Sequence, residues 1–186
     1  PGTYQDVTDT SVTAMFRAKR ESLPDFLQQV EGPISFLAWT TTPWTLPSNT
    51  ALTVGPKIEY CLVKTFNQYT FNPCNIIVAK DLLEAQFDKK FKRIENKAAL
   101  SSYKQGDKIP YFIEEQTFKG SELVGIRYDQ LLPYALPHEN PQNAFRVIAG
   151  DFVTTQDGTG IVHTSPTFGA DDAEVARQAD PPVPPL

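Results

Sequence analysis

The chain has 186 residues and a formal net charge of −5 at pH 7. This length suits a single domain with a substantial core, which we expect to span residues 1–186. The acidic balance argues against a dedicated nucleic-acid-binding module, whose surface is usually basic. No apolar run approaches the roughly 20 residues that a membrane-spanning helix needs. The chain begins at Pro1 rather than at Met and ends in a proline-rich stretch, so we expect a domain excised from a larger protein.

Strand patterns dominate the chain. Seven segments are rich in β-branched or aromatic residues and are separated by loops marked by Gly, Pro and Asn. In chain order the predicted strands are 12–18, 34–39, 58–66, 75–79, 111–118, 145–153 and 160–163. Two helices are predicted, at 80–89 from its apolar face and at 171–179 from its acidic start. Many short strands with few helices predict a mostly β (α+β) fold, a barrel-like body with peripheral helices.

Cysteine and histidine are scarce. Cys61 and Cys74 fall in different predicted strands, and two cysteines in a chain of this size are more often free thiols than a disulfide, which stays open as the alternative. With only His138 and His163 beside them, no metal-ligand spacing exists. We therefore expect neither a metal nor another cofactor.

The most informative segment is 39–49, Trp-Thr-Thr-Thr-Pro-Trp-Thr-Leu-Pro-Ser-Asn, which directly follows an apolar run. The apolar run predicts a buried strand, and Pro43 and Pro47 prevent its simple continuation. A strand that ends in a rigid turn lined by hydroxyl groups is typical of the rim of a small-molecule pocket. From composition alone, a threonine-rich sheet edge without a function is the alternative.

A second segment, 157–172, reads Asp-Gly-Thr-Gly-Ile-Val-His-Thr-Ser-Pro-Thr-Phe-Gly-Ala-Asp-Asp. It combines a glycine-rich turn, a strand that ends in His163, and a Gly-x-Asp-Asp sequence. Asp172 could anchor an ammonium group or carry the charge of a helix N-terminus. His163 could be a packed structural residue or, with an ordinary pKa near 6.5, a general base.

Together the two segments resemble the editing domain of isoleucyl-tRNA synthetase, the CP1 insertion of this class I aminoacyl-tRNA synthetase family. The resemblance covers nearly the whole chain. Valyl and leucyl relatives carry Thr-Thr-Arg-Pro where this chain has Thr41-Thr42-Pro43, which favours the isoleucyl assignment. The His-Ile-Gly-His and Lys-Met-Ser-Lys-Ser motifs of the family's catalytic core are absent, so we do not expect this chain to activate an amino acid.

The resemblance implies hydrolysis of the aminoacyl ester of mischarged Val-tRNA(Ile), with isoleucine excluded by its size. The implied partners are the 3′ end of tRNA(Ile) with its valyl-adenosine and the remainder of the parent synthetase, with no membrane, and the default compartment is the cytoplasm. Two alternatives remain. The chain could be a fragment that binds the ligand without turning it over, or an editing domain for another small aliphatic aminoacyl-tRNA.

The resemblance also assigns roles to individual residues. Asp172 binds the α-ammonium group, the threonine hydroxyls position substrate and water, and Asp171 is then the expected helix cap. His163 serves first as the side-chain sieve, second as a polar substrate contact and third as a general base. The expected catalytic residues are Thr40, Thr41, Thr42 and Asp172, and the expected substrate-binding residues are Trp44, Thr45, Asn49, Gly158, Thr159, Gly160 and His163.

Overall fold

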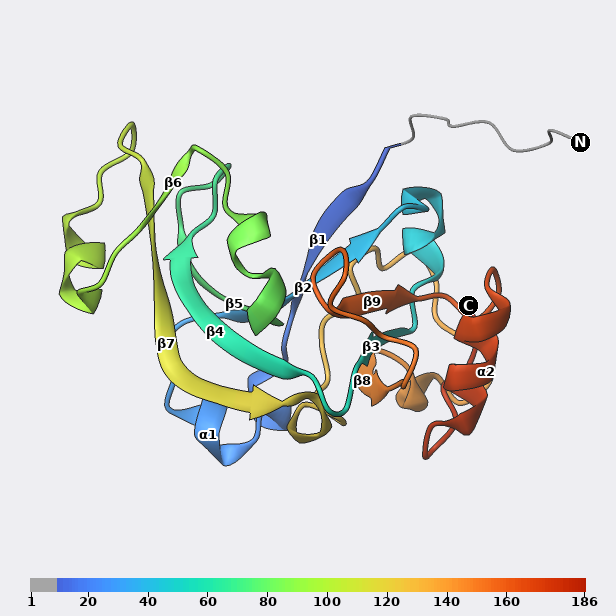
Figure 1. Ribbon diagram of the computed structural model, residues 1–186. Coiled ribbons are helices and arrows are strands. Elements are labelled where there is room, and N and C mark those ends of the chain that lie inside the picture. Colours follow the sequence, from blue (N-terminus) through green and yellow to red (C-terminus); the bar gives the residue numbers. More distant parts are fainter. Residues whose placement is uncertain (1–9) are drawn as a thin grey trace, which may run out of the picture.

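The computed structural model describes residues 10–186. Its framework is a mixed sheet of nine strands in this part of the chain (Figure 1). The strands are β1 (Val12–Arg17), β2 (Ile34–Thr40), β3 (Ala51–Val54), β4 (Glu59–Phe66), β5 (Pro73–Ala79), β6 (Phe91–Arg93), β7 (Ile109–Lys119), β8 (Arg146–Ala149) and β9 (Ile161–Thr164). Their order is β6-β7-β4-β5-β2-β9-β3-β8, and β1 pairs with β2. The predicted mostly β fold is confirmed.

Helices are few and short. The α-helices are α1 (Asp25–Gln28) and α2 (Ala170–Gln178), and the 3₁₀ turns are η1 (Arg20–Ser22), η2 (Pro43–Ser48), η3 (Lys80–Leu82), η4 (Glu84–Gln86), η5 (Lys97–Ser102), η6 (Gly120–Glu122) and η7 (Pro141–Asn143). The helix predicted at 171–179 is confirmed as α2, whereas the helix predicted at 80–89 is wrong. That segment forms η3 and η4, and Phe87 then turns to extended backbone and stacks on Tyr111 with ring centroids 4.0 Å apart.

Half of the sheet closes into a small barrel. From β2 the sheet passes through β9 and β3 to β8. Isolated bridges then lead back to the end of β1, because Arg127 pairs with Arg146 and Tyr128 pairs with Ala18. The core of this ring holds Phe16 edge-on against Tyr128, with centroids 5.3 Å apart. Such closure leaves few free sheet edges.

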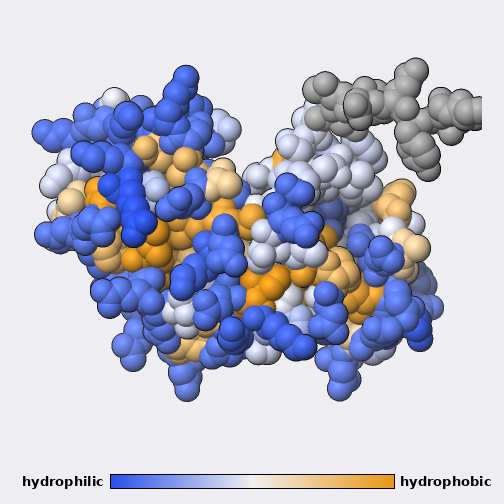
Figure 2. All heavy atoms as spheres, viewed as in Figure 1, coloured by the Kyte–Doolittle hydropathy of each residue, from blue (hydrophilic) through white to orange (hydrophobic). Residues whose placement is uncertain are grey.

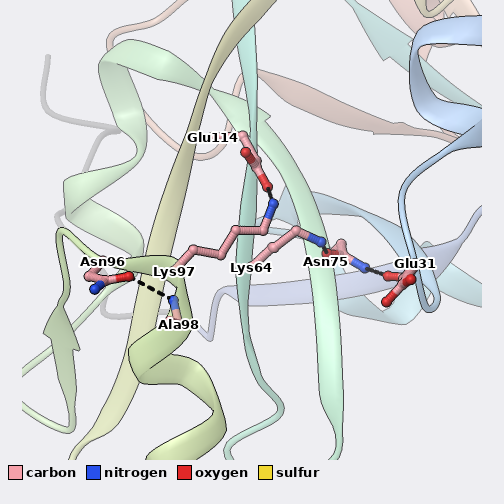
Figure 3. A network of polar contacts seen from close by, with 7 residues as sticks. All are labelled: Glu31, Lys64, Asn75, Asn96, Lys97, Ala98 and Glu114. Carbon is pink, nitrogen blue, oxygen red and sulfur yellow. Dashed lines mark hydrogen bonds and ion pairs between the residues drawn. The ribbon is translucent and has the colours of Figure 1, made fainter.

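The strands β4, β5 and β7 form an outer arm beside this barrel (Figure 1). Figure 3 shows the polar contacts that tie the arm together. Lys64 of β4 donates to Oδ1 of Asn75 across 2.9 Å, and Nδ2 of Asn75 donates to the backbone oxygen of Glu31 across 2.9 Å. Lys97 of η5 pairs with Glu114 of β7. The ion pair of Lys97 and Glu114 fixes η5 against the arm, and the amide of Asn75 fixes the loop after α1.

The predicted strand boundaries hold best where the apolar run is long. The strand predicted at 145–153 ends at Ala149, since Gly150 turns the chain and its N–H donates to the carbonyl of Val54 across 2.9 Å. The short strands β3 and β6 were not predicted. Figure 2 shows apolar residues between the arm and the barrel, where strands of both meet. Within residues 10–186 no helix has the length and hydropathy of a membrane span.

Candidate active site

The two sequence motifs lie side by side at one end of the barrel. The first motif leaves β2, forms η2 and enters β3, while the second motif contains β9. β3 and β9 pair in antiparallel register, with Leu52 opposite His163, and β2 meets β9 where Trp39 pairs with Val162. The pairing therefore brings the threonine-rich turn and His163 to one place.

His163 is the centre of the contact between the motifs. Its side chain is buried, and both ring nitrogens are hydrogen-bonded. Asn49 Nδ2 lies 2.8 Å from His163 Nδ1, and the same Nδ2 donates to the carbonyl of Ala51 across 2.9 Å. Because a carbonyl only accepts, the second bond fixes the orientation of the Asn49 amide, which must then donate to Nδ1. The neutral imidazole consequently carries its proton on Nε2, which donates to Thr45 Oγ1 across 3.0 Å.

The hydrogen bonds extend from His163 in both directions. Thr45 Oγ1 donates to the carbonyl of Thr42 across 2.8 Å and lies 3.3 Å from Thr42 Oγ1, which lies 3.2 Å from Thr40 Oγ1. At the other end, the Tyr128 hydroxyl donates to Asn49 Oδ1 across 2.6 Å. A continuous network therefore runs from the barrel core at Tyr128 to the threonines at the end of β2, and it fixes their geometry.

Burial sets the protonation of this network. It lowers the pKa of His163 to about 4, because the charged imidazolium loses its hydration. Burial also raises the pKa of Tyr128 well above its ordinary value, although the hydrogen bond to Asn49 acts in the opposite direction. At neutral pH the imidazole is therefore uncharged and the phenol keeps its proton. With both nitrogens already bonded, His163 has no free lone pair for use as a general base.

Asp172 lies in the first turn of α2, next to the same network. Its Oδ2 accepts the backbone N–H of Ser165 across 2.8 Å, and Ser165 Oγ donates to the carbonyl of Ser48 across 3.0 Å. Burial raises the pKa of Asp172, the hydrogen bond from Ser165 lowers it, and the charge of the neighbouring Asp171 raises it. In the described part of the chain its Oδ1 accepts no hydrogen bond. Oδ2 thus links the first turn of α2 to Ser165, while within residues 10–186 Oδ1 is available to a cationic group.

The sequence predicted Asp171 as the N-cap of α2, and this prediction is wrong. Gly169, rather than Asp171, is the N-cap residue, and as a glycine it has no side chain to cap the helix. A side chain at Gly169 would be crowded, since a Cβ atom would lie 3.1 Å from Cγ of Asp172. The glycine therefore makes room for the Asp172 carboxylate, while exposed Asp171 contributes only its charge to the first turn.

Several predicted site residues face solvent. Thr41 and Thr42 are exposed, and Trp44 is 63% exposed. Thr42 belongs to the network, whereas Thr41 forms none of its hydrogen bonds. Trp44 and the 64% exposed Phe168 place aromatic rings on the surface of the two motifs. These residues could be reached by a large ligand without any rearrangement of the core.

The Gly158-Thr159-Gly160 turn packs against the protein itself. Both glycines have positive φ angles, +76° and +74°. A Cβ atom on Gly158 would lie 2.8 Å from Cε3 of Trp39, and one on Gly160 would lie 2.4 Å from Cβ of Ala79. Buried Thr159 bonds to the backbone of Ile161. The structure therefore places this turn against β2 and β5, and it gives the three residues no hydrogen bond to His163 or Asp172.

Sequence reasoning missed Tyr128 and Ser165. Tyr128 stands in the segment that closes the barrel, where no strand pattern marks it, and it joins the site only through the fold. Ser165 lies inside the second motif, so its proximity to Asp172 could have identified it. Among the described residues, no group of three or more His, Cys, Asp or Glu side chains could hold a metal ion, and Cys61 and Cys74 are free thiols.

Several relatives of this chain are isoleucine–tRNA ligases. The chain is 57% identical over 98% of its length to the isoleucine–tRNA ligase of Cytophaga hutchinsonii and 53% identical over 100% to that of Bacteroides fragilis. It is 38% identical over 94% to that of Picrophilus torridus. The chain spans about 15% of the length of the first two relatives. No family model matches.

Solved structures that resemble this one include an editing domain of a leucyl-tRNA synthetase. The fold superimposes on the Plasmodium knowlesi cytosolic leucyl-tRNA synthetase editing domain with a TM-score of 0.65 at 16% identity, covering 90% of this chain and 63% of the other. The leucyl-tRNA synthetase domain GlLeuRS-CP1 gives a TM-score of 0.59 at 20% identity, covering 90% and 59%. The chain therefore has the CP1 editing-domain fold.

Proposed function

Because the chain is homologous to one segment of the isoleucine–tRNA ligases and has the CP1 editing-domain fold, we propose that it is their editing domain. In this proposal it hydrolyses the aminoacyl ester of mischarged Val-tRNA(Ile) and excludes isoleucine by size. The observation that carries the proposal is the hydrogen-bonded contact of His163 with Asn49 and Thr45, which assembles both motifs into one site.

The need for such a site follows from the size of valine. A missing methylene is worth only roughly 1–3 kcal/mol in an apolar pocket, a problem for which isoleucyl-tRNA synthetase is itself the standard example. A synthetic site built for isoleucine therefore accepts valine at a rate that protein synthesis cannot tolerate. A second site that admits the smaller product and rejects the larger one removes the error by hydrolysis.

Asp172 is the proposed anchor of the substrate. Its Oδ2 is held by the Ser165 N–H, while its Oδ1 has no hydrogen bond within residues 10–186, so the carboxylate is already oriented before a ligand arrives. An ammonium group forms a strong charge-assisted hydrogen bond with such a carboxylate. The α-ammonium group also supplies the counter-charge that the partly buried carboxylate lacks, which favours its ionised form on binding.

The threonines and His163 act by position in this proposal. A threonine hydroxyl is a weak base, so Thr40, Thr41 and Thr42 orient the ester and the attacking water rather than remove its proton. Water adds to the ester carbonyl, the bond from the acyl carbon to the ribose oxygen breaks, and valine and the free tRNA 3′ end leave. A hydroxyl group of the terminal ribose assists in activating the water, without a covalent enzyme intermediate.

His163 is the proposed sieve. Its imidazole is neutral and held at both nitrogens, so the ring is a rigid wall rather than a mobile acid or base. A rigid wall distinguishes side chains by size, whereas a mobile one would yield to the additional methylene of isoleucine. Gly158, Thr159 and Gly160 then act indirectly, by fixing the strand β9 that carries this residue.

The proposed partners are the 3′ end of tRNA(Ile) and the remainder of the synthetase, in the cytoplasm. The experiment is the release of labelled amino acid from Val-tRNA(Ile) and from Ile-tRNA(Ile) by this chain, together with hydrolysis of the valyl ester of adenosine. We expect faster release of valine than of isoleucine. Equal release of both would contradict the sieve, and an intact valyl-adenosine ester in the presence of ligand binding would indicate a binding domain without activity.

A further inference from the structure

A separate cavity, lined by apolar side chains and two arginines, lies at the other end of α2 from Asp172. It has a volume of about 510 Å³ and is lined by residues of β8, of the segment around Arg127 and of the C-terminal end of α2. A helix of nine residues, such as α2, rises about 13 Å along its axis. None of the residues of the His163 network lines this cavity. It is therefore distinct from the candidate active site.

Two arginines line the cavity from neighbouring segments. Arg127 and Arg146 form an antiparallel bridge. Side chains directly opposite one another in such a pair emerge on the same face of the sheet, with Cβ atoms about 5 Å apart. Arg146 is only 6% exposed and Arg127 is half-buried. The fold thus places two positive charges together in a partly closed space.

Neither arginine forms a salt bridge among the described residues, and the one carboxylate that lines the cavity, exposed Asp180, makes no ion pair with them. Each guanidinium makes one hydrogen bond to a carbonyl, Arg127 to Ala144 across 2.8 Å and Arg146 to Pro181. A guanidinium has five N–H donors, so most donors of both groups are unused within residues 10–186. Burial lowers the pKa of Arg146, the charge of Arg127 lowers it further, and exposed Asp180 acts in the opposite direction.

Anchoring of the helix end explains only part of this arrangement. The bond from Arg146 to Pro181 holds the segment after α2, and a cation near a helix C-terminus is favourable. Anchoring does not explain Arg127, whose positive charge lines the same cavity and disfavours the charged form of Arg146. Buried charges in proteins are normally paired, and an anion between the two guanidinium groups would remove the repulsion.

We propose that the cavity between β8 and the end of α2 binds a phosphate group between the guanidinium groups of Arg127 and Arg146. The planar donor fork of arginine matches the oxygen atoms of a tetrahedral phosphate. A tetrahedral phosphate presents oxygen atoms to both guanidinium groups at once and its dianion neutralises both charges, whereas a planar carboxylate offers two oxygens and one charge. This inference does not depend on the editing activity.

Calorimetric titration with inorganic phosphate tests the proposal, with Arg127→Gln as the variant and Arg93→Gln on the outer strand β6 as the matched control. We expect one phosphate per chain, bound roughly tenfold or more weakly by Arg127→Gln and unchanged in Arg93→Gln. Equal affinity in the two variants would overturn the site. Acetate at the same ionic strength should not compete, and a carboxylate that binds as tightly as phosphate would overturn the phosphate assignment.

A second measurement needs no variant. On addition of phosphate to the unmodified chain, the Nε–Hε nuclear magnetic resonance signals of Arg127 and Arg146 should shift, and that of Arg93 should not. Uniform shifts or none would again overturn the proposal. A dinucleoside monophosphate, titrated in the same way, identifies the source. Binding of this diester at the two arginines indicates a nucleic-acid backbone, while binding of inorganic phosphate alone indicates a small phosphate compound.

Discussion

Asn49 donates a hydrogen bond to Nδ1 of His163 across 2.8 Å, although the residues are 114 positions apart in the sequence. This bond joins the threonine-rich motif to the second motif and selects the Nε2–H tautomer of the imidazole. The same amide is held by the Ala51 carbonyl and by the Tyr128 hydroxyl. The orientation of His163 is therefore set by the barrel core and does not depend on a ligand.

The charge of Asp172 and its structural bond can be separated by substitution. Asp172→Asn keeps an oxygen that accepts the Ser165 N–H, so its stability should stay near that of the unmodified chain. Its hydrolysis of valyl-adenosine should fall by roughly 10–100-fold, since a charge-assisted bond of about 1.5–3 kcal/mol is lost. Asp172→Ala should lose the activity and also about 1 kcal/mol of unfolding free energy. Initial rates and denaturant titrations provide the two readouts.

Asp171→Asn is the matched control for this series, because it removes the same charge from the same helical turn at an exposed position. Its rate should remain close to that of the unmodified chain. If Asp171→Asn lost as much activity as Asp172→Asn, the negative charge at the helix start, rather than an anchor at Asp172, would explain the effect.

Replacement of His163 by alanine should change which ester is cleaved. Removal of the imidazole enlarges the space beside Asn49 and Thr45, so hydrolysis of isoleucyl-adenosine should appear. Both partners lose a buried hydrogen bond, and the unfolding free energy should fall by about 2 kcal/mol or more. Rates are therefore compared at a temperature where circular dichroism shows the variant folded. Loss of valine hydrolysis with isoleucine still excluded would refute the sieve.

The buried imidazole also predicts a pH dependence of stability. The folded-state pKa of His163 is about 4, below the ordinary 6.5, so the unfolded chain binds the proton more tightly. The free energy of unfolding that depends on a neutral His163 is fully present above pH 6.5 and is lost as the pH falls toward 4, by about 3 kcal/mol in total. Denaturant titrations between pH 6.5 and 5, before most carboxylates titrate, measure its onset. His163→Gln should flatten the slope in that range, and an unchanged slope would contradict the assignment to His163.

Gly160 should be intolerant of a side chain for two separable reasons. Its φ of +74° disfavours alanine, and a Cβ atom would lie 2.4 Å from Cβ of Ala79. Gly106 also has a positive φ, +107°, but a Cβ atom there would meet nothing within 4 Å, so Gly106→Ala reports backbone strain alone. Gly160→Ala should be less stable than Gly106→Ala by roughly 1–3 kcal/mol in unfolding experiments. Equal losses of stability in the two variants would mean that Ala79 and β5 shift to accommodate the added methyl group.

The fold class and the two motifs could be predicted from the sequence, whereas the geometry of the site could not. Runs of β-branched and aromatic residues bounded by turn signals predicted β2, β4, β5 and β7, and in β2, β4 and β5 these runs are buried almost without interruption. Four-residue β3 follows directly on the proline-containing turn, and its signal is too short to separate from that turn. The helix predicted at 80–89 failed because the apolar contacts of Leu82, Leu83 and Phe87 serve two 3₁₀ turns and an aromatic stack equally well.

The candidate site was predictable as a set of residues but not as an arrangement. The motifs identified His163, Thr45 and Asn49, whereas their mutual hydrogen bonds depend on the register of β3 against β9. Tyr128 enters through closure of the barrel, a contact that no local pattern encodes. Gly158 and Gly160 lie in close approach to Trp39 and Ala79, a packing that no local sequence pattern indicates.

The most direct test of the editing account is calorimetric binding of non-hydrolysable valyl and isoleucyl analogues of aminoacyl-adenosine to the unmodified chain and to Asp172→Ala. The account predicts that the valyl analogue binds, that the isoleucyl analogue binds much more weakly, and that Asp172→Ala loses the valyl affinity. Equal binding of the two analogues, or valyl binding unchanged by Asp172→Ala, would contradict it.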